Sequence, residues 1–128
     1  MSQITYLTQG GSVGPVNGMV TTVGAVTGDA ITIPLGATPA SYAIEVRIAA
    51  FNAATPAGAG YQVFGAVRTT GAAAVLIGTP DVVANEEAAL NAADVDIVVS
   101  ANNAIVRVTG VALLTIDWRA TALYTRVT

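Results

Sequence analysis

The chain has 128 residues, of which 53% are hydrophobic and 10% are charged, with a net charge of −3 and neither histidine nor cysteine. This length suits one domain with a single core, and the acidic balance argues against binding to nucleic acid, which relies on clustered Lys and Arg. Without histidine and cysteine, the usual general base, the usual transition-metal ligands and the thiol nucleophile are missing. We therefore expect neither catalysis nor a cofactor.

The first forty residues are rich in Gly, Thr and Val and carry no charge before Asp29. Glycines at this density disfavour a helix, so residues 1–40 are predicted to form an extended arm or docking strands. Within them, residues 30–35 are typical of a short strand that closes at Pro34, because proline cannot sit in a central ladder. The N-terminus lacks the basic start and apolar core of a secretory signal, so we expect no export.

A sandwich domain is predicted over residues 41–128. Its first strand is indicated by residues 41–49, where hydrophobic side chains alternate with Ala, Glu and Arg at a period of two. Two further strands, 61–68 and 73–78, are predicted to form a hairpin through the turn at residues 69–71.

One short helical segment is predicted over residues 85–93, which have the highest helix propensity in the chain. Asn85 is its candidate N-cap, and Glu86 and Glu87 lie in its first turn. At most, this segment makes one or two turns. The two adjacent glutamates would not face each other on a helix or a strand, so they indicate a solvated acidic turn and not an acid/base pair.

The clearest hairpin is predicted over residues 94–110, with a turn at Ala101-Asn102-Asn103 made of residues that tolerate a left-handed backbone. Asp94 and Asp96 would share one face of its first strand, and this spacing suits calcium only if a third oxygen ligand joins them. No Asx-rich loop completes such a site, so we expect no metal.

The last predicted strand runs over residues 114–127 and alternates around Ile116, Trp118 and Tyr124. About eight short strands joined by Gly, Pro and Asn turns predict an all-β fold, an antiparallel, jelly-roll-like β-sandwich with an extended N-terminal arm. Trp118 is expected in the core. An alternative is that Trp118 or the nearby tyrosines form a platform on which sugars stack.

The low charge predicts a buried subunit interface, since no apolar run is long enough for a membrane-spanning helix and obligate interfaces carry few charges. The alternative is that exposed Ala and Gly account for the hydrophobic composition of a monomer. The residues that we assign to the core or an oligomer interface are Val106, Val108, Ile116, Trp118 and Tyr124. The candidates for ion pairs between subunits are Arg107, Asp117 and Arg119.

Four segments resemble modules of bacteriophage virion proteins, namely the short domains of tail fibres, spikes and related appendages. They are residues 42–47, 60–68, 92–111 and 115–120. The resemblance implies a trimeric β-sandwich in the virion, made in the host cytoplasm and bound to other virion proteins. Such modules usually end longer fibre chains, whereas this chain begins at Met1 after a short lead, which also fits a stand-alone capsid decoration or appendage-tip protein.

The first functional hypothesis is therefore a phage structural protein that acts by packing. A second is a receptor-binding tip whose loops, around residues 52–60 and 85–91, contact a host surface polysaccharide. A third, a glycan depolymerase, is disfavoured because no paired carboxylates stand out.

Overall fold

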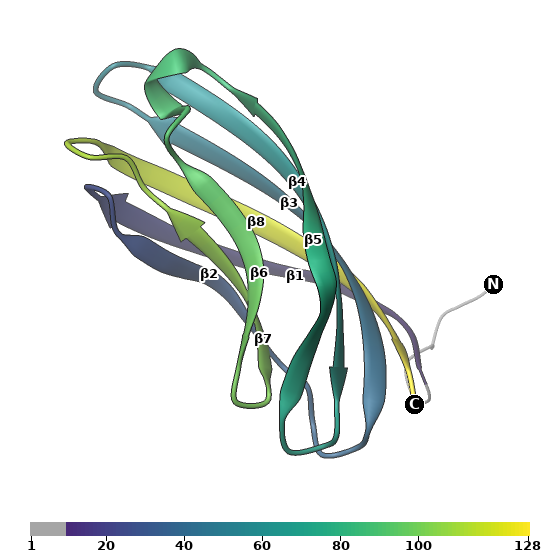
Figure 1. Cartoon of the computed structure of the whole chain (residues 1–128). Coiled ribbons are helices and arrows are strands. Elements are labelled where there is room, and N and C mark those ends of the chain that lie inside the picture. The colour runs from purple at the N-terminus through teal and green to yellow at the C-terminus, as the bar shows by residue number, and fades with distance from the viewer. Residues whose placement is uncertain (1–9) are drawn as a thin grey trace.

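The computed structural model describes residues 10–128 as two antiparallel sheets packed as a sandwich (Figure 1). The five-stranded sheet has the order β1-β8-β3-β4-β5, and the three-stranded sheet has the order β2-β7-β6. The elements are β1 (Gly10–Val23), β2 (Thr27–Pro34), β3 (Ala40–Asn52), β4 (Ala57–Thr69), β5 (Ala74–Glu86), the 3₁₀ turn η1 (Ala88–Leu90), β6 (Asp94–Ser100), β7 (Asn103–Thr109) and β8 (Thr115–Val127). The predicted all-β sandwich of eight antiparallel strands is confirmed.

The segment before residue 41 contributes strands to both sheets. β1 pairs with β8 from Gly10 opposite Val127 to Val23 opposite Thr115, and β2 pairs with β7. The first strand thus lies next to the last strand, and the second strand lies next to the second-to-last. This nested pairing makes the fold jelly-roll-like. Residues 10–34 of the expected arm thus lie within the sandwich, and residues 1–9 of that arm lie outside the described residues.

Strands β3, β4 and β8 owe their place in the centre of the large sheet to their alternating sequences. In β3, every second side chain from Tyr42 to Asn52 is buried and those between are exposed. The same alternation runs through β8, where Ile116 and Trp118 point into the core. Because side chains directly opposite each other in a ladder share a face, these strands bury one continuous apolar surface against β2, β6 and β7.

The segment predicted as one or two helical turns begins later and is shorter than expected. Asn85 and Glu86 belong to β5, where they pair with β4, and Glu87 takes the N-cap position without a side-chain capping bond. Only η1 is helical in this segment. The pairing of β5 with β4 overrides the local helix propensity, and Leu90 anchors η1 in the core. Among residues 10–128, no helix is long and apolar enough to span a membrane.

The β6–β7 hairpin turns as predicted, but its left-handed residue is Ala101, with φ of 52°, and not an asparagine. Asn102 uses its side chain instead. Its amide nitrogen donates to the Gly36 carbonyl over 2.7 Å, and its amide oxygen accepts a hydrogen bond from the hydroxyl of Thr69. Asn102 therefore ties the β2–β3 and β4–β5 connections to its own turn.

We predict that Ala101→Gly stabilises the fold by about 0.5–1 kcal/mol. A left-handed non-glycine residue costs about 1–2 kcal/mol, and this gain exceeds the entropy that glycine adds to the unfolded chain. Urea unfolding followed by circular dichroism measures the difference. Ala72→Gly is the matched control, because Ala72 is exposed in a turn without a positive φ, and it should lower stability. Equal losses in both variants would contradict the prediction.

Candidate functional site

The connections at one end of the sandwich form a distal end, opposite the end where β1 starts and β8 finishes (Figure 1). The distal end consists of residues 24–26, 53–56, 87–93 and 110–114. The two loops proposed above to contact a polysaccharide lie here and are bonded to each other. The Glu87 amide donates to the Gly58 carbonyl over 3.1 Å, and the Gly58 amide donates to the Glu87 carboxylate over 2.9 Å.

An asparagine holds the β3–β4 loop in place. Asn52 is buried, its amide nitrogen donates to the Thr115 carbonyl over 2.9 Å, and its side-chain oxygen accepts from the backbone and hydroxyl of Thr55. The distal loops also expose apolar side chains. Leu113 is 99% exposed with φ of 69°, and Val26 is about half exposed. Hydrogen bonds therefore hold the β3–β4 loop of this end in place, and the other distal loops expose apolar side chains.

Four of the five residues assigned to the core or an interface lie in the core of the chain's own sandwich. Val106, Val108, Ile116 and Trp118 are buried. Tyr124 is half-buried, and its ring centroid lies 5.7 Å from that of Tyr42. Since Trp118 has no exposed surface, the alternative in which it forms a sugar-stacking platform is wrong.

Trp118 instead organises a buried polar and aromatic group. Its indole nitrogen donates to the Thr22 hydroxyl over 2.9 Å, and its ring stacks on that of Tyr61 with centroids 6.0 Å apart. The Tyr61 hydroxyl donates to the Glu86 carboxylate over 2.7 Å. Burial, followed by this hydrogen bond and the Glu86 charge, raises the pKa of Tyr61 well above its usual range.

The raised pKa of Tyr61 predicts a loss of stability at alkaline pH. Above about pH 10 the unfolded chain releases the Tyr61 proton while the folded chain keeps it, so unfolding becomes more favourable by up to about 1.4 kcal/mol per pH unit. Below pH 10 the contribution is fully present. Urea titrations from pH 9 to 11.5 should show a shallower decline for Tyr61→Phe than for the wild type. The decline does not vanish in the variant, because burial also raises the pKa of Tyr42. Identical slopes would contradict the prediction.

The three residues proposed for ion pairs between subunits have different surroundings. Arg107 pairs within the chain, because its Nε lies 2.9 Å from Asp29 Oδ1 across the β2–β7 ladder. Asp117 accepts a hydrogen bond from the Thr21 hydroxyl over 2.8 Å. Arg119 is exposed. Asp117 and Arg119 form no ion pair with each other or with another described residue.

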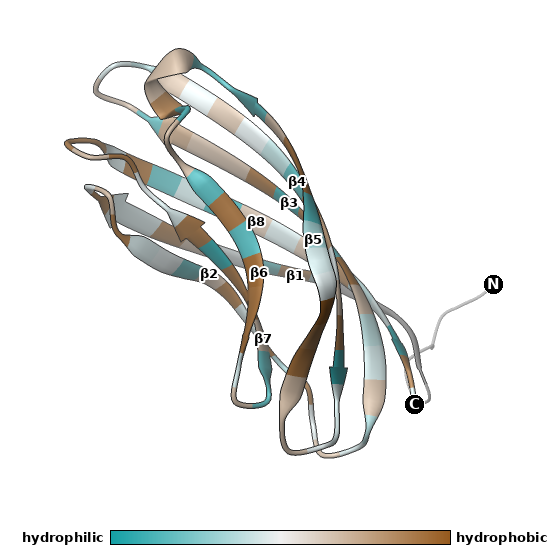
Figure 2. Ribbon diagram, viewed as in Figure 1, coloured by the Kyte–Doolittle hydropathy of each residue, from teal (hydrophilic) through white to brown (hydrophobic). Residues whose placement is uncertain are grey.

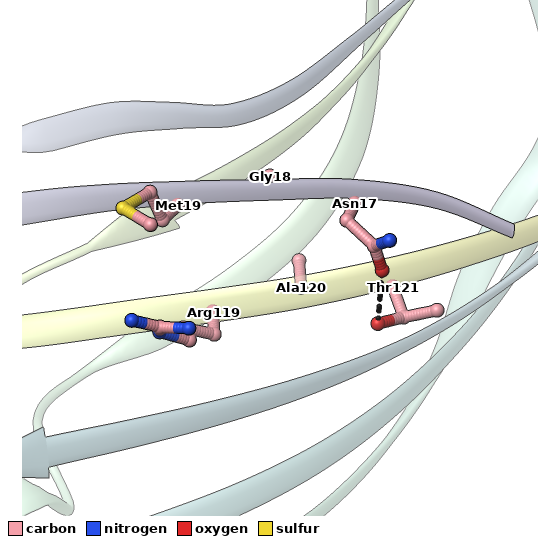
Figure 3. A pocket seen from close by; sticks show the side chains of 6 residues that line it. All are labelled: Asn17, Gly18, Met19, Arg119, Ala120 and Thr121. Carbon is pink, nitrogen blue, oxygen red and sulfur yellow. Dashed lines mark hydrogen bonds between the residues drawn. The ribbon is translucent and has the colours of Figure 1, made fainter.

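Arg119 borders a shallow depression of about 380 Å³ between β1 and β8 (Figure 3). Asn17 and Thr121 close one side of it through a hydrogen bond of 2.9 Å, and Met19 lies on the other side beside Arg119. A second depression of about 340 Å³ lies over Ala43. It is lined by Ala43, Glu45, Phe64, Leu123, Tyr124 and Thr125.

Both depressions open on one surface, which we call the outer face: the side of the five-stranded sheet that turns away from the three-stranded sheet. Figure 2 shows hydrophobic segments on the strands of this sheet, most strongly at the start of β5. Nine large apolar side chains are exposed on the outer face: Met19, Val23, Phe51, Phe64, Val75, Ile77, Val83, Leu123 and Val127. No comparably exposed large apolar side chain of the described chain lies on β2, β6 or β7.

This face was not predicted from the sequence. Its signal was present in the same alternation that predicted the strands: Phe64 and Leu123 fall at positions that alternate with the buried ones, yet they are large and apolar. When the exposed positions of a strand are also apolar, the pattern predicts that another molecule covers the exposed face of the sheet.

The acidic residues that were considered as catalytic groups or calcium ligands accept hydrogen bonds from nearby groups of the chain. Asp94 and Asp96 each accept from the amide of the following residue, over 2.9 and 2.8 Å. The Glu86 carboxylate accepts from the Tyr61 hydroxyl, and the Glu87 carboxylate accepts from the Gly58 amide. Within residues 10–128, no three His, Cys, Asp or Glu side chains are grouped to hold a metal ion.

The sequence matches no protein-family model and no curated protein. Among solved structures, the chain is similar to the tailspike protein of Acinetobacter baumannii phage AM24, with 7% identity, a TM-score of 0.38, and coverage of 87% of this chain and 26% of that one. It is also similar to the tailspike protein of Acinetobacter phage vB_ApiP_P1, with 18% identity, a TM-score of 0.38, and coverage of 98% and 23%. The chain spans about a quarter of the length of these tailspikes. It thus has a distant structural resemblance to part of two phage tailspike proteins.

Proposed function

We propose that this chain is a structural protein of a phage virion, a trimeric β-sandwich that forms part of a tail fibre or spike or decorates the capsid. The sequence segments that resemble phage virion modules support this role, because each coincides with strands of the sandwich. Residues 42–47 lie in β3, residues 60–68 in β4, residues 92–111 span the β6–β7 hairpin, and residues 115–120 lie in β8.

The observation that carries the proposal is the outer face. Exposed apolar patches larger than a few hundred Å² are rare on monomers and mark surfaces that bind other molecules. Here the apolar side chains sit on long, regular strands, and not on adaptable loops. A rigid sheet face with nine exposed large apolar side chains suits permanent assembly better than transient recognition.

A structural role also accounts for the carboxylates better than catalysis does. General acid/base work requires a pair of titratable groups that face a common space. Glu86 is bonded to Tyr61, and Asp94 and Asp96 bond to their own strand. We therefore propose that the chain acts by packing against other virion proteins.

Light scattering coupled to size exclusion tests the assembly. We expect a mass near three times that of the 12.8 kDa chain. Phage particles produced from a genome that encodes the chain should also contain it, as measured by mass spectrometry of purified particles. A monomer at all concentrations, together with particles that lack the chain, would overturn the proposal.

A second candidate function is recognition of a host surface polysaccharide by the distal end. The observation in its favour is the pair of hydrogen bonds that joins the β3–β4 loop to the η1 segment, which fixes two exposed loops side by side. Substitutions at exposed Thr55 and Asn91 would then abolish binding to host cells while the oligomer mass stays unchanged. Unchanged binding in both variants would contradict this function.

A further inference from the structure

We infer that copies of this chain associate through the outer face of the five-stranded sheet, with the outer faces of the copies turned toward one another around the axis of the oligomer. The inference rests on the oligomeric function proposed above and names the surface that carries it. Its two central apolar residues are Phe64 on β4 and Leu123 on β8, which are 47% and 45% exposed. Both lie opposite Glu45 of β3 and flank it.

The charges of the outer face are balanced, unlike those of the rest of the chain. Six charged residues of the outer face comprise three acids and three arginines: Glu45, Asp81, Asp117, Arg47, Arg68 and Arg119. The remaining charged residues comprise five acids and two arginines: Asp29, Glu86, Glu87, Asp94, Asp96, Arg107 and Arg126. The whole net charge of −3 therefore lies outside the outer face, and that remaining surface would repel its own copy.

A balanced face can meet its own copy with acids opposite arginines. None of the three outer-face arginines forms an ion pair with a described residue, whereas Arg107 on the opposite sheet pairs with Asp29. Arginine is suited to such contacts, since its planar guanidinium is weakly hydrated and binds carboxylates through two parallel bonds. The outer face thus presents unpaired cations and anions to a partner that carries the same set.

The size of the outer face matches the need of a stable interface. Five strands about 4.8 Å apart, each about 13 residues long at about 3.3 Å per residue, cover on the order of 1,000 Å² in plan. A standard protein–protein interface buries about 800 Å² on each partner. The depression over Ala43, with its volume of about 340 Å³ between Leu123 and Phe64, provides a hollow for an apolar side chain of the neighbouring copy.

Charge reversal tests the inference without any knowledge of the exact packing. In one variant, Arg47→Glu, Arg68→Glu and Arg119→Glu give the outer face six acids. In the other, Glu45→Lys, Asp81→Lys and Asp117→Lys give it six bases. We expect each variant alone to be a monomer of about 12.8 kDa, and an equimolar mixture to associate again, with a mass above that of the monomer in light scattering. Circular dichroism confirms that each variant is folded.

A single substitution provides an independent check. Phe64→Glu is expected to dissociate the oligomer, whereas Leu113→Glu, at a fully exposed leucine of the distal end, leaves its mass unchanged. An oligomer that survives Phe64→Glu and both charge reversals would overturn the inference and leave the oligomeric function intact. A monomeric wild-type chain would instead overturn the proposed oligomer itself.

Discussion

Replacing Trp118 by alanine is expected to lower the free energy of unfolding by about 3–5 kcal/mol, the usual cost of removing a large aromatic side chain from a core. Trp118 of β8 has no exposed surface, and side chains of both β1 and β4 contact it, so no single strand can move to fill the space. Its removal also leaves the buried Thr22 hydroxyl without its donor. Since domains are stable by only about 5–15 kcal/mol, the variant should be close to unfolding at 37 °C.

Two further variants separate packing from hydrogen bonding at this position. Trp118→Phe keeps most of the apolar volume but removes the bond to Thr22, and it should cost about 1–3 kcal/mol. Combining Trp118→Phe with Thr22→Val should cost less than the sum of the two single changes, because no polar group remains unpaired. Urea unfolding followed by fluorescence and circular dichroism gives these values. A loss below about 1 kcal/mol for Trp118→Ala would contradict the assigned position of Trp118 in the core.

The period-two pattern was the part of the sequence that predicted the fold best. It placed strands β3, β4 and β8 within a few residues of their observed bounds, and it assigned Trp118 and Ile116 to the core or an oligomer interface, of which the structure shows the core. The prediction worked because alternation depends only on neighbouring residues in the chain. Each of these strands has one face buried, so its sequence carries the signal directly.

Features that depend on distant pairing were not predictable in this way. β1 and β2 are rich in glycine, and their places in the two sheets follow from pairing with β8 and β7, which lie about a hundred and about eighty residues away in sequence. The extension of β5 through Glu86 depends on its register with β4, which overrides the local preference for helix. The role of Asn102, which joins three connections, is likewise visible only once β2, β4 and β6 are in place.

The outer face was missed for a different reason. The low charge predicted a buried interface, and residues of β7 and β8 were assigned to the core or to that interface, but the sandwich itself buries all of them except Tyr124, which is half-buried. The alternation of a strand predicts which residues share a face, but it does not predict which of the two faces meets the other sheet. That choice was resolved only by the three-stranded sheet, which covers the face of Trp118 and leaves Phe64 exposed.

Gly18→Ala is the second change with a large expected effect, because Gly18 marks the point where the edges of the two sheets meet. A Cβ atom at residue 18 would overlap the carbonyl oxygen of Ala30 and lie 2.8 Å from the side chain of Ile31. Both atoms belong to β2, the edge strand of the three-stranded sheet, which lies beside β1, the edge strand of the five-stranded sheet (Figure 1). The backbone carbonyl cannot rotate away, so the strands must separate.

Overpacking a core lowers the free energy of unfolding by about 1–3 kcal/mol and sometimes more. We expect the loss for Gly18→Ala to exceed this range, because the added Cβ overlaps a backbone atom. Gly60→Ala is the matched control. Gly60 also lies in a strand of the large sheet, but nothing lies within 4 Å of its added Cβ, so this variant should be as stable as the wild type or slightly more so. Thermal unfolding of the two variants and the wild type measures the difference in stability. Equal stability would mean that β1 does not approach β2 as closely as the sandwich requires, and that residues 10–34 behave as an arm and not as part of the core.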